Sequence, residues 1–163
     1  MLHEMTKKTK IEEGFLIEKY MDYVLEYHKK PNSVNSFAKK FDFNESDFYS
    51  FFGSFSSLES QIFARFFDNT IKTLNKSKDY SNFDSMNKIL SFYFTFFANL
   101  TTNRSYVKFS LSNGNSKLNK IKQLRLLRKK FLSFIDGLDL GISELKNKNL
   151  DDVKDRVVNE SYW

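Results

Sequence analysis

Residues 33–58 read SVNSFAKKFDFNESDFYSFFGSFSSL and predict two short helices joined by a tight turn. Ser33 is a favourable N-cap residue, and the apolar side chains that follow it recur at helical spacing. Asp42 tolerates the left-handed conformation that a turn at this point requires. Asn44 can cap the second helix, and we expect Gly53 to end that helix by adopting a positive φ. Two short helices around such a turn form a helix-turn-helix pattern.

This pattern resembles the DNA-reading half of the TetR family of bacterial transcriptional regulators. The positions that carry the resemblance are Phe37, Ala38, Phe43, Asn44, Phe48, Tyr49, Phe52 and Leu58. The resemblance implies an all-α, TetR-like fold: a three-helix head with an N-terminal arm over 1–55 and a helical ligand-binding and dimerisation domain over 56–163. Members of the family carry further helices near the C-terminus that form the dimer interface. We therefore expect the second domain to be incomplete, a truncated C-terminus stays open, and we expect a homodimer if those helices are present.

The resemblance also implies which residues meet DNA. Ser33 and Tyr49 are expected at phosphates. The expected contacts to bases or backbone are Asn44, Glu45, Ser46 and Ser50. The outward face departs from the family pattern, because Glu45 and Asp47 place two carboxylates where the family carries polar or basic side chains. Carboxylates oppose binding in a phosphate-lined groove, although a glutamate can accept a hydrogen bond from cytosine.

The composition favours an all-helical protein and excludes several kinds of site. One Pro and five Gly in 163 residues leave few positions that interrupt helices. The chain has no Cys, which rules out disulfides, thiolate nucleophiles and Cys-based zinc sites. It has two His, and it shows no Gly-rich phosphate loop and no recognisable catalytic pair. We therefore expect that this protein is not an enzyme and that it binds no metal ion and no cofactor.

The net charge of +6 is unevenly distributed. Residues 1–50 contain eight Lys/Arg and nine Asp/Glu, whereas residues 101–163 contain 13 and seven. A protein held to DNA by phosphate contacts should concentrate cations near its reading head, so this distribution weakens the DNA prediction. The densest run is KLNKIKQLRLLRKK at 117–130, which has seven cations, no carboxylate and an apolar stripe that includes Ile121. Such a helix can pack on a core, lie on a membrane surface or meet an acidic partner.

Hydrophobic periodicity predicts further helices along the chain. They span 11–27, 56–74, 86–100, 103–111, 117–138 and 144–163. A capping box at 56–59 should open the second of these, which would connect the head to the rest of the protein. Helix 86–100 is apolar around nearly its whole circumference and should be central. Aromatic side chains there can be ordinary core or can line a cavity. The candidate ligand-pocket residues are Phe67, Phe92, Tyr93, Phe96, Phe97 and Phe109.

Two functions follow as predictions. The first is a TetR-type one-component regulator, a repressor that binds operator DNA as a homodimer and takes an apolar or aromatic small molecule in its C-terminal domain. The alternative is a protein of the same fold that has lost DNA binding and holds lipid at a membrane surface, as ubiquinone-biosynthesis accessory proteins do. The N-terminus does not resemble a signal peptide, and the apolar windows are too short to span a bilayer, so a cytoplasmic location is expected.

Overall fold

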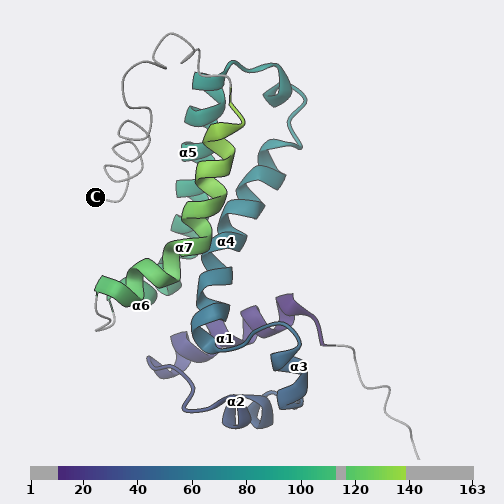
Figure 1. Ribbon diagram of the computed structural model, residues 1–163, viewed down its shortest axis with the longest axis vertical. Coiled ribbons are helices and arrows are strands. Elements are labelled where there is room, and N and C mark those ends of the chain that lie inside the picture. Colours follow the sequence, from purple (N-terminus) through teal and green to yellow (C-terminus); the bar gives the residue numbers. More distant parts are fainter. Residues whose placement is uncertain (1–10, 113–116, 139–163) are drawn as a thin grey trace, which may run out of the picture. The chain divides into compact units, whose positions relative to one another are not determined.

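The first three helices pack around one buried aromatic side chain. They are α1 (Glu13–Tyr27), α2 (Val34–Lys40) and α3 (Glu45–Tyr49). They belong to a computed structural model, of which residues 11–112 and 117–138 are described (Figure 1). Phe37 of α2 is fully buried, and its ring lies 5.1 to 6.4 Å from six other aromatic rings, measured between centroids. Those rings belong to Tyr20, Tyr23, Phe41, Phe43, Phe48 and Phe55. Because most of these contacts are edge-to-face, they stabilise the cluster beyond simple burial.

The predicted N-cap of α2 and the turn between α2 and α3 are confirmed. The Ser33 hydroxyl accepts a hydrogen bond from the Ser36 N–H at 3.1 Å, which satisfies one of the free donors at the start of α2. Asp42 has a φ of 55°, the left-handed conformation that the turn requires. The next residue, Phe43, donates its N–H to the Ala38 carbonyl at 3.1 Å and holds the turn against α2.

Two expectations for the segment after α3 were wrong. Gly53 does not adopt a positive φ, and α3 ends earlier, at Tyr49. The chain keeps a helical turn there, because the Phe52 N–H still bonds the Phe48 carbonyl at 2.9 Å, so no left-handed residue is needed. The capping box of the next helix lies at 54–57 rather than 56–59. Ser54 and Ser57 exchange hydrogen bonds between each backbone N–H and the other hydroxyl, at 3.1 and 3.2 Å.

The remaining elements are α4 (Phe55–Leu74), η1 (Tyr80–Asn82), α5 (Ser85–Thr102), α6 (Arg104–Ser112) and α7 (Lys117–Asp136). The described residues divide into two compact units. The first contains 11–58 and 105–112, and the second contains 59–104 and 117–138. Helix α4 therefore starts in the first unit and continues in the second, while α6 belongs to the first. The described elements are all helical, which confirms the predicted all-α class.

In the second unit α4, α5 and α7 lie side by side (Figure 1), and aromatic rings from all three helices meet at Phe92. The Phe92 side chain is 1% exposed, and its ring lies 5.1 Å from Phe67 of α4 and 4.9 Å from Phe134 of α7. A polar contact also joins α5 to α4, because the Asn99 side-chain amide donates to the Phe66 carbonyl at 3.1 Å. Burial of these rings stabilises this unit.

Two expectations for this unit were also wrong. Helix α5 is not buried on all sides, because Phe94 and other apolar residues of one face are largely exposed, at 71% for Phe94. Ile121 of α7 is 67% exposed instead of joining the apolar stripe. No helix in the described part of the chain is both long and apolar enough to cross a membrane. The expected arm at 1–10 and the expected helix at 144–163 lie outside the described residues.

Candidate nucleic-acid interface and ligand site

The predicted DNA contacts lie together at the start of α2 and along α3. The side chains that are exposed to solvent are Ser33, Asn44, Ser46, Tyr49 and Ser50. Tyr49 is 54% exposed and its ring is held edge-on by the buried Phe48 at 5.6 Å. The capped start of α3 positions Asn44 and Ser46, and the aromatic core beneath positions Tyr49.

The two carboxylates of α3 are engaged within the first unit. Asp47 accepts a hydrogen bond from the Asn44 backbone N–H at 2.9 Å, as the third residue of a capped helix commonly does. Glu45 accepts a hydrogen bond from the Asn35 side-chain amide, which ties the start of α2 to the start of α3. Both carboxylates are half-buried. They therefore have a structural role in the turn, which the sequence pattern alone did not reveal.

The hydroxyls of Ser33 and Ser50 already make local hydrogen bonds: Ser33 accepts from the Ser36 N–H and donates to the Ser36 hydroxyl at 3.2 Å, whereas Ser50 acts only as a donor. Ser50 donates its hydroxyl to the Ser46 carbonyl at 2.8 Å, so its oxygen remains available as an acceptor. Ser33 uses its oxygen to cap α2. These hydroxyls and the Tyr49 phenol can contact phosphate or base edges, but they bring no positive charge.

Lysines that the sequence analysis did not single out lie at the ends of α1 and α2. The Lys40 ammonium donates a hydrogen bond to the Tyr27 hydroxyl at 2.6 Å and lies 4.4 Å from the centre of that ring. This hydrogen bond raises the pKa of Lys40 above its ordinary value. The adjacent pairs at 29–30 and 39–40 were visible in the sequence as short basic runs. Even so, the described part of the first unit contains six Lys/Arg and eight Asp/Glu.

The structure brings together only some of the candidate ligand residues. Phe67, Phe92, Tyr93 and Phe96 form one ring cluster, in which Phe92 lies 6.1 Å from Tyr93 and 5.4 Å from Phe96. Phe97 is 57% exposed and lies at the edge of this cluster, because its ring is 6.1 Å from Tyr93 and 6.3 Å from Phe96. Phe109 lies on α6, which belongs to the first unit.

The sequence analysis missed two rings that belong to this cluster. Phe131 and Phe134 of α7 lie 5.6 and 4.9 Å from Phe92. Their helical spacing was apparent in the sequence, but the pairing of α7 with α5 was not. A buried tyrosine adds a polar group to the same unit: the Tyr80 hydroxyl has no hydrogen-bond partner, and burial raises the pKa of Tyr80 above its ordinary value.

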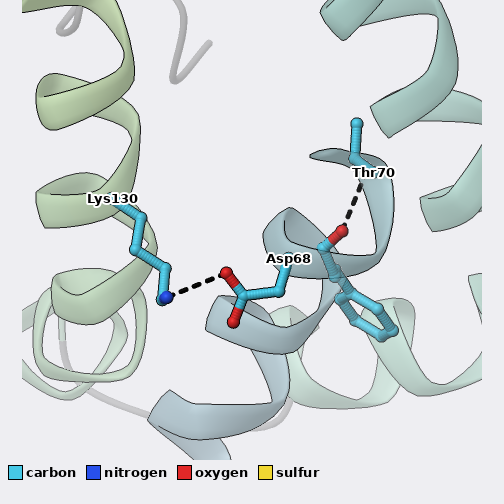
Figure 2. A network of polar contacts seen from close by, with 4 residues as sticks. Asp68, Thr70 and Lys130 are labelled. Atoms are coloured by element: carbon cyan, nitrogen blue, oxygen red, sulfur yellow. Dashed lines mark hydrogen bonds and ion pairs between the residues drawn. The ribbon is translucent and has the colours of Figure 1, made fainter. Parts of the chain in front are cut away.

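Positive charge gathers on the second unit. Its described residues contain 13 Lys/Arg and five Asp/Glu. Figure 2 shows one cation that is neutralised locally: Lys130 of α7 donates to the Asp68 carboxylate of α4 at 2.8 Å. Lys122, Arg125 and Lys129 are exposed on α7, so this helix presents a basic surface.

Comparison with known proteins supports the class of protein that the fold indicates. Residues 88–163 match the family described as "Tetracyclin repressor-like, C-terminal domain". The match covers slightly less than half of the chain. It supports the similarity to the TetR family, and it lies in a different region from residues 33–58, which carried the sequence resemblance. No match to a curated protein or to a solved structure was found. No comparison covers residues 33–58, so the resemblance of that segment to a DNA-reading motif stays a prediction.

Proposed function

We propose that this chain is a TetR-type one-component transcriptional regulator, a repressor that binds operator DNA through α2 and α3. The observation that carries the proposal is a combination within one chain. A capped pair of short helices with an exposed polar face, from Ser33 to Ser50, precedes a region similar to the C-terminal domain of tetracyclin-repressor-like proteins. On this proposal the reading head spans 1–55 and the ligand-binding and dimerisation domain spans 56–163.

In the proposed complex α3 enters the major groove. Two copies related by a two-fold axis would place their α3 helices in successive major grooves. Ser33 and Tyr49 then contact phosphates, while Asn44, Ser46 and Ser50 face bases or backbone. Glu45 reads cytosine only if its carboxylate leaves Asn35 or accepts hydrogen bonds from both groups. Affinity therefore comes from hydroxyl and backbone contacts and from lysines outside α3.

We further propose that an apolar or aromatic small molecule binds at the ring cluster around Phe92. The rings that support this placement come from three helices: Phe67 from α4, Phe92 and Phe96 from α5, and Phe134 from α7. A ligand that separates these helices would change the position of α4, whose first residues contact the head through Phe55. Mass spectrometry of small molecules that co-purify with the protein tests this part.

A gel shift with the DNA upstream of the chain's own coding region tests the DNA proposal. We expect specific binding at low salt that weakens steeply as salt rises, since phosphate contacts release counterions. Tyr49→Phe should weaken binding without changing the melting temperature, because the hydroxyl is exposed. Ser77→Ala is the control, since it removes an exposed hydroxyl that lies outside the head and leaves the Lys40–Tyr27 contact intact. Equal binding of competitor DNA at every salt concentration would contradict the proposal.

A second function is favoured by the charge distribution: a protein of the same fold that has lost DNA binding and associates with an anionic membrane surface. The first unit carries more carboxylates than cations among its described residues, whereas the second is strongly basic. On α7 the exposed Ile121 lies beside exposed Lys122 and Arg125. An apolar side chain among cations is typical of helices that lie on anionic lipid.

Sedimentation with vesicles of phosphatidylserine and phosphatidylcholine distinguishes the two functions. The informative variant is Arg125→Glu/Lys129→Glu, because Lys130 is already paired with Asp68. Lys76→Glu/Lys78→Glu changes the net charge equally at exposed positions between α4 and η1. Loss of vesicle binding in the first variant alone, together with no specific gel shift, would favour the membrane function. Equal loss in both variants would indicate a nonspecific charge effect.

A further inference from the structure

One face of α5 presents a row of large apolar side chains to solvent. These residues, with their exposed fractions, are Phe83 (37%), Met86 (70%), Leu90 (52%), Phe94 (71%) and Phe97 (57%). The four that lie within the helix recur at steps of four, four and three residues, which places them along one side. Phe83 precedes the helix, just before its N-cap Asp84. Contiguous exposed apolar rows of this kind mark interaction sites.

The opposite face of α5 is already fixed to its own unit. Phe92 packs on Phe67 and Phe134, and Asn99 donates to the Phe66 carbonyl. Because these contacts hold α5 against α4 and α7, the helix cannot turn its apolar row inward without losing them. The row therefore needs an occupant from outside the arrangement of α4, α5 and α7.

The spacing of the row is symmetric about Leu90. Met86 and Phe94 lie four residues to either side of it, and Phe83 and Phe97 lie seven residues to either side. An isologous two-fold interface requires such self-complementarity, because residue i of one copy contacts residue j of the other and j contacts i. In an antiparallel pair of α5 helices Leu90 would meet Leu90. Met86 would meet Phe94, a contact that thioether and aromatic groups favour.

Charge also favours a second copy over other occupants. Lys88 is the one charged residue in Ser85–Thr102, and it is half-buried on the side away from the row. Two α5 faces can therefore approach without like-charge repulsion. Two α7 faces cannot, since that helix carries seven cations. An anionic partner would be drawn to α7 rather than to this uncharged row.

We propose that two copies of this chain associate through α5, antiparallel, around a two-fold axis that passes near Leu90. The inference rests on the proposed regulator, which needs two copies to read two half-sites, and it specifies the surface that joins them. It differs from the expectation that helices near the C-terminus would form the dimer contact.

Site-directed disulfide formation tests this placement in a clean background, because the chain has no cysteine. Leu90→Cys should form a disulfide-linked dimer under mild oxidation, since Cα atoms at the axis would come within about 7 Å. Met86→Cys and Phe94→Cys should cross-link when mixed and much less when alone. Ile121→Cys is the control, because Ile121 is even more exposed than Leu90, at 67% against 52%, but lies on α7. Circular dichroism of the reduced variants checks that each one folds.

Light scattering on the unmodified protein and on Leu90→Lys supplies the second measurement. We expect a dimer for the unmodified protein and a dissociation constant raised by about tenfold or more for Leu90→Lys, which places two charges on the axis. A dimer that Leu90→Cys does not cross-link would overturn the α5 contact and leave the regulator intact. A monomer would also overturn it, and the gel shift would then decide separately whether DNA binding survives.

Discussion

The side-chain amide of Asn35 donates a hydrogen bond to the carboxylate of Glu45 and joins the first turns of α2 and α3. The contact fixes the outward face of α3 relative to α2 and holds a negative charge there. Glu45 thus has a structural role in addition to its proposed place at the DNA-facing surface. Separating the two depends on removing the charge without removing the hydrogen-bond acceptor.

Glu45→Gln makes that separation. The glutamine oxygen can still accept from Asn35, so we expect little change in melting temperature. DNA affinity should rise several-fold at low salt, because one like-charge repulsion with phosphate is removed. Glu18→Gln is the control, since that carboxylate is exposed on α1 and its ion pair with Lys19 is weak. Equal affinity changes in both variants would show that α3 does not face the DNA.

Ala38→Leu tests the packing of α2. Ala38 is 2% exposed, so three additional carbon atoms have no space and should lower the free energy of unfolding by about 1–3 kcal/mol. Lys39→Leu adds an apolar side chain at the next, exposed position and should change it by less than about 0.5 kcal/mol. Urea denaturation measures both. Indistinguishable midpoints would contradict the packing described for α2.

Phe92→Ala tests the aromatic cluster of the second unit. Removing a ring that is 1% exposed should cost about 3–5 kcal/mol and leave a cavity. Ile121→Ala, which shortens an exposed side chain, should cost little. If the cavity binds the proposed ligand class, an apolar compound such as benzene should raise the melting temperature of Phe92→Ala more than that of the unmodified protein. A small loss for Phe92→Ala would show that α4, α5 and α7 do not pack around it.

Tyr80 should make stability depend on pH in the alkaline range. Burial raises its pKa, so the folded protein holds the phenolic proton more tightly than the unfolded chain does. The associated stability is present below the ordinary pKa of about 10 and is lost as pH rises through the raised pKa. The melting temperature of the unmodified protein should therefore fall more steeply above about pH 9.5 than that of Tyr80→Phe. Parallel curves would place the hydroxyl in contact with water.

Local signals in the sequence were enough to predict the N-cap of α2 and the turn that follows this helix. Ser33 and Asp42 act through their own backbone neighbourhood, and each has the role expected from its side chain. The prediction that Gly53 adopts a positive φ was wrong because glycine permits this conformation without requiring it. The capping box formed by Ser54 and Ser57 was missed because this segment contains several serines, and the sequence alone does not show which of them caps the helix.

Contacts between distant segments could not be predicted in the same way. An apolar pattern around the whole of α5 predicts burial only if enough helices surround it, and that number depends on the rest of the chain. Ile121 fits a helical stripe by spacing, yet the face that contacts α5 is set by Phe131 and Phe134 further along. Glu45 was judged by its charge alone, since its partner Asn35 lies on another helix.

A nuclease footprint on the DNA upstream of the coding region tests the central claim most directly. The account predicts two protected half-sites whose centres are separated by about 10 base pairs, or a multiple of that spacing, because a two-fold dimer presents its two α3 helices on one side of the duplex. Protection should diminish in Tyr49→Phe. Uniform DNA cleavage at low salt, with protein shown to be folded and dimeric, would contradict the assignment of α2 and α3 as a DNA-reading element.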